Sequence, residues 1–545
     1  MLLPIRVERS LNYRSWLLVA LLCCTGCESL LGVHFEEYRR RADAGDASDM
    51  DAGDASDMDA GDASSVDPGE MPRGDGPTTS GDAGNDADVA SDASSDSDAT
   101  VGRQDSGVHE NDAGTLPSAS FQLVSSGHDP QVAVNRHGDA AVVWLQKASS
   151  DPPIDQIWMS RFDGQQHQWL APELVSDPAS TTDESYPRVV IDDEGTVAVF
   201  WTQLLTLWAR TWTMGKWHDA QLVAQNQFSG PLQVSPPDAM GRIVAVWADS
   251  ESSTKPGAGP TDYTVRLLAS RYTPAASTWE PYQPISQDGH DVTHWVQGTA
   301  PGGETFVVWT EVQDQQYEPV VAASLDVASG TWRAPVVVGN KQLGPESPLA
   351  LAIAEIGDDV LTLWQQYVEG TPNNLWTNRS NDGVWSTPER PATAAIAEGS
   401  SPTLASGPGN GATALWLIHG SRQPGSATYD PMTSSWSSVD PVAPAGSQVA
   451  SSASLAMHID AQGGRLALWT QINSTKIEIG YNGAPQGTAW QASAARTIAT
   501  DIPNPDAWEG CGEPVLAVGV PGQALIVWPA RAGSDVEIRG QWVTY

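Results

Sequence analysis

The sequence has few basic residues and very few cysteines. Lys and Arg total 28 of 545 residues against 67 Asp and Glu, so the formal net charge is −39. Such an acidic chain argues strongly against a partner with a phosphate backbone, and no nucleic-acid role is expected. The four cysteines cannot form a disulfide framework, because Cys23, Cys24 and Cys27 lie together and Cys511 lies far away.

Long helices and long apolar runs are also missing. Charged residues make up only 17% of the chain, whereas Gly (50), Pro (39) and Trp (23) are abundant. This composition suits short strands joined by many turns. The apolar run at residues 16–24 follows an arginine-rich segment and is too short for an ordinary transmembrane helix, so it indicates a secretory signal.

The end of this signal resembles the lipobox of bacterial lipoproteins. Gly26 precedes Cys27, and Cys24 stands where Leu is usual. The resemblance implies that residues 1–26 are a signal peptide and that Cys27 is diacylated. The protein is then extracytoplasmic and anchored in a bacterial membrane, at the outer membrane or cell surface. The departure at Cys24 leaves plain secretion as the alternative.

Residues 27–118 are predicted to form a disordered tether. The octapeptide DAGDASDM occurs twice in succession and is followed by DAGDASSV, and residues 41–118 hold 20 acidic and 3 basic residues. Self-repulsion should keep this segment extended and free of a core. Calcium binding is the alternative, but the run from Asp49 to Gly53 lacks the closing Glu of a calcium loop.

An internal repeat begins after residue 118. Eight apolar runs each end in a tryptophan, called the marker tryptophan below, with a mean spacing of about 55 residues, which suits propeller blades: Trp144, Trp201, Trp247, Trp309, Trp364, Trp416, Trp469 and Trp528. In six units a proline stands 14 or 16 residues before the marker, and in six units a glycine stands six residues before it. Residues 119–545 are therefore predicted to be all-β, an eight-bladed propeller of four-stranded antiparallel blades, with seven blades as the alternative.

The last unit stops after its third strand. The segment at 121–124 resembles the fourth strand of the other units, so we expect it to pair with residues near 536–542 and close the ring. A closed ring has no free edge, and we expect a monomer.

Nine-residue segments that end in a second tryptophan resemble the Asp-boxes of sialidase-like propellers. The best carriers are Ser324, Asp326, Gly330, Thr331 and Trp332, although the spacing departs from the family's pattern. In that family the box is a folding element opposite the active site, so the resemblance implies a fold and not catalysis. The arginine cluster, the tyrosine–carboxylate pair and the acid of a sialidase cannot be placed in this sequence.

No residue pattern identifies a reaction. His290 and His294 are four apart, but in a loop and strand and without a third ligand, so no metal site is predicted. Cys511 has no nearby His, and no P-loop, dinucleotide fingerprint or Gly-x-Ser-x-Gly elbow is present, so no cofactor is predicted. Paired carboxylates for glycoside cleavage could come from a nonspecific set: Asp129, Asp183, Glu184, Asp291, Glu346 and Glu513.

Aromatic residues in loops entering the first strands are the candidate ligand contacts. Tyr186, Trp295 and Trp508 have this position, and Trp295 replaces the proline of the sibling units. Exposed rings suit glycan or peptide contacts, whereas packing inside the loops is the alternative. We expect a cell-surface or periplasmic binding or scaffold module for a glycan or protein. The alternative is a propeller enzyme acting on carbohydrate, a glycosidase or lyase.

Overall fold

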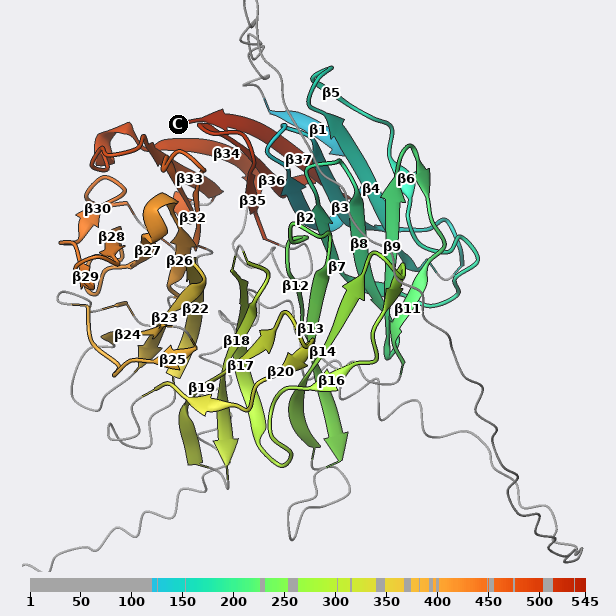
Figure 1. Cartoon of the computed structure of the whole chain (residues 1–545). Helices are drawn as coiled ribbons and strands as arrows, with labels where there is room; N and C mark the ends of the chain where they lie inside the picture. Colours follow the sequence, from blue (N-terminus) through green and yellow to red (C-terminus); the bar gives the residue numbers. More distant parts are fainter. Residues whose placement is uncertain are drawn as a thin grey trace, which may run out of the picture. The chain divides into compact units, whose positions relative to one another are not determined.

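The computed structural model describes residues 120–545 except 125, 152, 226–230, 253–262, 301, 314–315, 340–347, 367–373, 382, 392–395, 398–400, 448, 450–454, 474–475, 503–512 and 534. These residues form an all-β propeller of eight antiparallel sheets (Figure 1). The predicted fold class and blade number are confirmed. Among the described residues, no helix is long and apolar enough to cross a membrane.

Each blade has an inner strand a, two long strands b and c, and an outer strand d. In five blades strand d is split into two short pieces that both pair with strand c. Blade 1 contains β2 (His128–Val134), β3 (Ala140–Lys147), β4 (Asp155–Asp163), β5 (Gln168–Trp169) and β6 (Glu173–Leu174). Blade 2 contains β7 (Glu184–Ile191), β8 (Val197–Gln203), β9 (Thr206–Thr213), β10 (Lys216–Trp217) and β11 (Gln221–Ala224).

The next four blades repeat this order. Blade 3 contains β12 (Leu232–Val234), β13 (Ile243–Ser252), β14 (Tyr263–Thr273), β15 (Thr278–Trp279) and β16 (Gln283–Pro284). Blade 4 contains β17 (Asp291–Thr299), β18 (Thr305–Gln313), β19 (Gln316–Asp326), β20 (Thr331–Trp332) and β21 (Val336–Val337). Blade 5 contains β22 (Pro348–Ile356), β23 (Asp359–Gln366), β24 (Asn374–Asn381) and β25 (Val384–Trp385). Blade 6 contains β26 (Thr403–Ser406), η2 (Pro408–Asn410), β27 (Ala412–Leu417), β28 (Pro424–Asp430), β29 (Ser435–Trp436) and β30 (Asp440–Pro441).

The last two blades complete the ring. Blade 7 contains β31 (Leu455–Ile459), β32 (Arg465–Asn473), β33 (Lys476–Ala484), η3 (Ala492–Ala494) and β34 (Arg496–Ile502). Blade 8 contains β35 (Val515–Val518), β36 (Gln523–Ala532) and β37 (Asp535–Thr544), and β1 (Phe121–Val124) supplies its outer strand. Phe121 pairs with Gly540 and Val124 with Ile538, which confirms the predicted closure.

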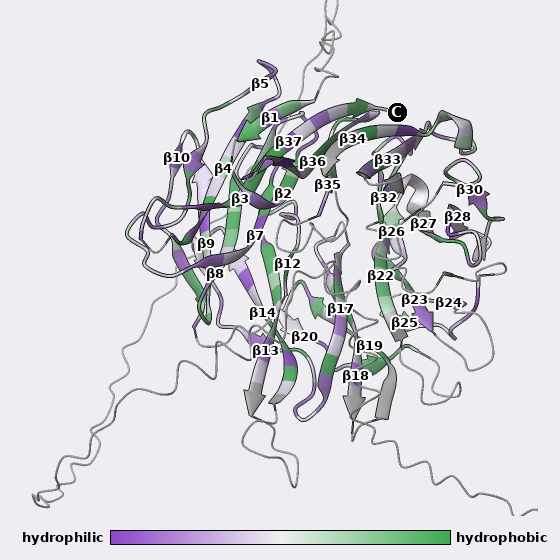
Figure 2. Ribbon diagram, turned by 180° about the vertical axis from the view of Figure 1, so that it is seen from behind, coloured by the Kyte–Doolittle hydropathy of each residue, from purple (hydrophilic) through white to green (hydrophobic). Residues whose placement is uncertain are grey.

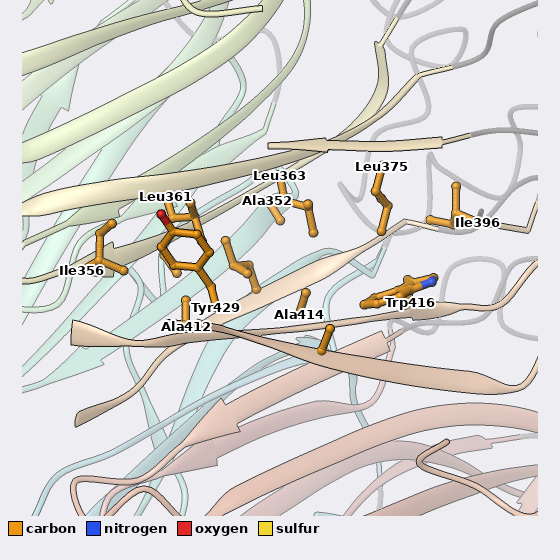
Figure 3. Packing of buried hydrophobic residues seen from close by; sticks show 13 residues of the cluster. Ala352, Ile356, Leu361, Leu363, Leu375, Ile396, Ala412, Ala414, Trp416 and Tyr429 are labelled. Carbon is orange, nitrogen blue, oxygen red and sulfur yellow. The ribbon is translucent and has the colours of Figure 1, made fainter. Parts of the chain in front are cut away.

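The core lies between neighbouring blades. Apolar residues follow the strands, for example along β3 and β22 (green in Figure 2). Between blades 5 and 6, Leu361 and Leu363 face Ala414 and Trp416 in one buried cluster (Figure 3). Because each sheet has two apolar faces, every blade packs on both neighbours, and the strands a follow one another around the ring until β35 reaches β2.

The marker tryptophans are the largest side chains of this core. All eight are at most 3% exposed. Four of them donate Nε1–H to a side chain two residues later: Trp144 to Gln146, Trp309 to Glu311, Trp364 to Gln366 and Trp469 to Gln471. Trp416 and Trp528 have Ile418 and Ala530 at that position, and within the described part of the chain their indole N–H groups have no partner.

The turns that join strands a and b use the predicted glycine. In all six units that carry it, φ of this glycine is positive, a left-handed conformation that glycine adopts without strain. The remaining hairpins, in blades 5 and 6, place Gly357 and Gly409 one residue earlier, again with positive φ.

The turns that resemble Asp-boxes are closed by their own side chains. Asp326 Oδ1 accepts hydrogen bonds from Ser329 N (2.8 Å) and Ser329 Oγ (2.9 Å), and Asp430 Oδ1 accepts one from Met432 N (2.9 Å). Thr433 Oγ1 also donates to Asp430 Oδ2 at 2.8 Å. The hydrogen bonds of Ser329 lower the pKa of Asp326, and those of Thr433 and Met432 lower the pKa of Asp430, because they favour the ionised carboxyl. The geometry is that of a folding turn.

Candidate functional site

Charged side chains gather where strands a of blades 1 and 2 begin. His128 lies between two carboxylates: Nδ1 is 3.3 Å from Asp129 Oδ2, and Nε2 is 3.1 Å from Asp155 Oδ1. Burial lowers the pKa of His128, but the hydrogen bonds and charges of Asp129 and Asp155 outweigh it and raise the pKa to about 9. At neutral pH the ring is therefore an imidazolium that donates both N–H groups.

Two neighbouring groups hold Asp155 in place. Lys147 Nζ is 3.2 Å from Asp155 Oδ2, and the backbone N–H of Asp155 donates to Asp183 Oδ1 at 2.9 Å. Asp291 plays the same part as Asp183. Its Oδ1 accepts a hydrogen bond from the backbone N–H of Val265 at 2.8 Å, which joins blades 3 and 4. Both of these predicted carboxylates thus hold the start of a strand c.

Asp129 and Tyr186 occupy matching places in the two blades. Each precedes a proline, lies at a bulge in strand a and has positive φ, 50° and 53° respectively. Positive φ is strained for residues other than glycine, and strain of this kind within a strand, outside a tight turn, is a feature that clusters at functional sites. The Tyr186 ring is half-buried against the cluster that contains Phe200 and Trp247. The strain therefore presents two polar side chains at equivalent points of the inner edge.

Arg188 lies two residues beyond Tyr186 on β7. Its Nε donates to the carbonyl of Leu232 in blade 3 at 3.0 Å, and its Nη1 donates to the carbonyl of Pro187 at 2.8 Å. Burial lowers the pKa of Arg188, and the charges of Asp129 and Tyr186 oppose this effect, so both lie within electrostatic reach. We call His128, Asp129, Asp155, Tyr186 and Arg188 the blade 1–2 rim.

Glu184 lies beneath this rim as a buried acid. It is 2% exposed, and its Oε2 accepts a hydrogen bond from Ile157 N at 3.0 Å. Burial raises the pKa of Glu184 to about 7, although hydrogen bonds from Ser176 and from Ile157 N lower it in part. A carboxyl with this pKa is protonated in the folded protein at pH values where the unfolded chain has already lost the proton.

Replacing Glu184 with Gln should therefore stabilise the protein in a pH-dependent way. Between pH 4.5 and 7 the folded state binds more protons at this site than the unfolded state, so the wild type loses stability as pH rises. The difference in free energy of unfolding between the variant and the wild type should grow from almost nothing at pH 4 to about 3 kcal/mol at pH 8. Urea unfolding at both pH values measures it. An equal difference at pH 4 and pH 8 would show that Glu184 is not the titrating group.

Trp295, one of the predicted ligand contacts, lies in the core. It is 3% exposed and packs in the cluster that contains Val292 and Trp309. A ring with so little accessible surface has the environment of a packing residue, which was the alternative considered from the sequence. Its role in binding stays a prediction. Trp508, Cys27, Cys511 and Glu346 lie outside the described residues.

The two histidines of blade 4 do not form a pair. His290 precedes β17 and its Nδ1 is 2.7 Å from Glu311 Oε1, whereas His294 lies within β17 and its Nδ1 is buried with no hydrogen-bond partner. Burial lowers the pKa of His294. Over the part of the chain described, no three His, Cys, Asp or Glu side chains are grouped as metal ligands.

The comparisons with known proteins concern the fold. No family model and no curated protein matches the chain. A polysaccharide lyase, an ulvan lyase, matches with 12% identity and a TM-score of 0.41 over 78% of this chain and 96% of that chain. An α-L-arabinanase from Penicillium chrysogenum matches with 10% identity and a TM-score of 0.34 over 79% and 96%. An intramolecular trans-sialidase from Ruminococcus gnavus matches with 12% identity and a TM-score of 0.31 over 78% and 96%. These similarities carry no argument about activity.

Proposed function

We propose that this chain is an exported, lipid-anchored propeller that binds a saccharide at the blade 1–2 rim. One observation supports this most: charged and aromatic side chains are concentrated on the strained inner strands of two adjacent blades. Backbone strain costs free energy, and both strain and perturbed ionisation cluster at functional sites. The signal and the Cys27 motif support an extracytoplasmic location.

The chemistry of the rim suits sugar hydroxyl groups. Asp129 is 40% exposed at its side chain and offers carboxylate acceptors, while Arg188 has N–H donors. The Tyr186 ring can cover the apolar C–H face of a pyranose, and its hydroxyl can donate or accept. A saccharide uses acceptors, donors and a flat apolar surface together, whereas an apolar ligand uses only the last of these.

A polysaccharide binding screen of the full chain tests this proposal. We expect at least one polysaccharide to bind, and Tyr186→Ala together with Asp129→Ala to weaken that binding strongly. Leu222→Ala on the outer strand β11 is a matched control, because it changes an exposed apolar side chain of the same blade, away from the inner strand. Binding that survives the double replacement unchanged would move the function off the blade 1–2 rim.

Replacing Cys27 with Ala should release the protein from the membrane. The thioether to the lipid needs the cysteine sulfur, and the two acyl chains of the diacylated residue supply the anchoring that no described helix provides. Fractionation of cells that express the wild type and the variant measures the effect. A wild type already in the soluble fraction, or a variant that stays with the membrane, would refute lipid anchoring.

Catalysis on the bound saccharide is the second candidate function. It is favoured by His128, which carries a proton at neutral pH while it contacts the partly exposed carboxylate of Asp129. Such a pair offers an acid and a base side by side. Incubating a bound polysaccharide with the protein should then shorten it, and Asp129→Asn should prevent this. An unchanged chain length with the wild type leaves binding as the function.

A further inference from the structure

We propose that Arg188 binds the acidic group of the ligand, so that the ligand is a saccharide bearing carboxylate or sulfate groups. This inference rests on the proposed function and names the class of saccharide. It follows from the register of the inner strands, from the hydrogen bonds that Arg188 makes, and from the neighbours of its guanidinium.

The register shows that the fold does not need a charge at this position. Arg188 pairs with Phe200, the residue before the marker tryptophan of blade 2. The residues that pair with the equivalent position in the other blades are all uncharged: Gln131, Gln233, Val296, Ala352, Thr403, Ala456 and Val515. Because the seven equivalent positions have uncharged residues, the blade fold does not require an arginine here.

The contact that Arg188 makes with the next blade could also be made by a side-chain amide. Gln233, at the same register in blade 3, donates Nε2–H to the Trp295 carbonyl at 3.2 Å and accepts from Gln297 N at 2.8 Å, which ties blade 3 to blade 4. Arg188 ties blade 2 to blade 3 in the same way through its bond to the Leu232 carbonyl. A glutamine at position 188 could therefore keep the tie between the blades and remove the charge.

The guanidinium of Arg188 has more N–H groups than acceptors and forms no ion pair with a described carboxylate. Its hydrogen bonds run from Nε and Nη1 to the carbonyls of Leu232 and Pro187. Asp129, whose charge acts on Arg188, is already hydrogen-bonded to His128. Arg188 is half-buried as a residue. A guanidinium with only carbonyl acceptors gains most from an anion that accepts two N–H groups at once.

The overall negative charge of the protein does not prevent this contact. Repulsion between exposed charges is largely screened beyond about 8 Å at physiological ionic strength, whereas a direct pair at a half-buried site is screened much less. The guanidinium can therefore pair directly with an anion although the chain as a whole is acidic.

The test compares three probes on the full chain: neutral dextran, dextran sulfate and polygalacturonate. We expect the wild type to prefer at least one of the two acidic polymers to dextran, and the preferred polymer distinguishes sulfate from carboxylate recognition. Arg188→Gln should weaken binding of that polymer by about 30-fold, since charged hydrogen bonds are lost. Arg188→Lys should keep part of the affinity, because the positive charge remains but the paired N–H donors of the planar guanidinium are lost.

Arg210→Gln is the matched control. Arg210 also donates to two carbonyls, those of His218 and Val175, but it stacks on Trp217 between blades 1 and 2. This variant should bind as the wild type does. Dextran bound as tightly as both acidic polymers, or Arg188→Gln binding the acidic polymer as the wild type does, would overturn the inference and leave the proposed function standing. Failure to bind any polysaccharide would overturn the proposed function itself.

Discussion

Replacing Trp309 with Ala should lower the free energy of unfolding by about 5 kcal/mol. The ring is fully buried between blades 3 and 4, and its truncation leaves a large cavity. The change also leaves Glu311 Oε2 without the indole N–H that it accepts at 3.0 Å. A buried carboxylate that loses a donor adds its desolvation cost to that of the cavity. Guanidinium or urea unfolding followed by fluorescence and circular dichroism measures the loss.

Trp416→Ala is the control for the hydrogen-bonded part of this loss. Trp416 is equally buried between blades 5 and 6, but its indole N–H has no partner in the described structure. Its replacement should cost about 4 kcal/mol, from the cavity alone. A larger loss for Trp416→Ala than for Trp309→Ala would contradict the role given to the Glu311 hydrogen bond.

Deleting residues 119–127 should destabilise the propeller by about 3 kcal/mol or more. The deletion removes β1, exposes the edge of β37 and takes away the Phe121 ring, which lies 5.4 Å from the Trp169 ring. The ring also fits against Gly540, where a Cβ would come within 2.8 Å of it. The lost pairing and the lost aromatic packing act on the seam that joins blade 8 to blade 1. The melting temperature should fall by several degrees.

Deleting residues 41–110 is the matched control for chain length. Their composition predicts a segment without a core, so the melting temperature should stay at the wild-type value. If the intact protein and the 119–127 deletion melted at the same temperature, β1 would not be a closing strand.

Features that repeat along the chain could be predicted from the sequence. The marker tryptophans gave the blade number, because a buried ring is needed in each seam between blades. The glycine six residues before the marker gave the hairpins, since only its backbone adopts positive φ freely. The apolar segment that contains Phe121 predicts how the ring closes, because it can supply the outer strand that the last unit lacks. Each of these rests on local sequence and on period.

The candidate site depends on contacts between strands and between blades that the repeat of the sequence does not predict. His128 meets Asp155 from a different strand, and Arg188 reaches the Leu232 carbonyl of the next blade. Comparing the units by strand register would have singled out Arg188, but the register depends on bulges whose positions the sequence did not show. The replacement of a proline of the repeat predicts Trp295 at the rim, yet its ring is buried between blades 3 and 4.

Hydrogen–deuterium exchange of the full chain, with and without a saturating concentration of the polysaccharide found in the screen, tests the location of the site most directly. The account predicts slower exchange in peptides that cover β2, β7 and the loops leading into them, with little change in blades 5 to 7. Protection confined to blades 5 to 7, or to the turns between strands c and d, would contradict a ligand site at the blade 1–2 rim.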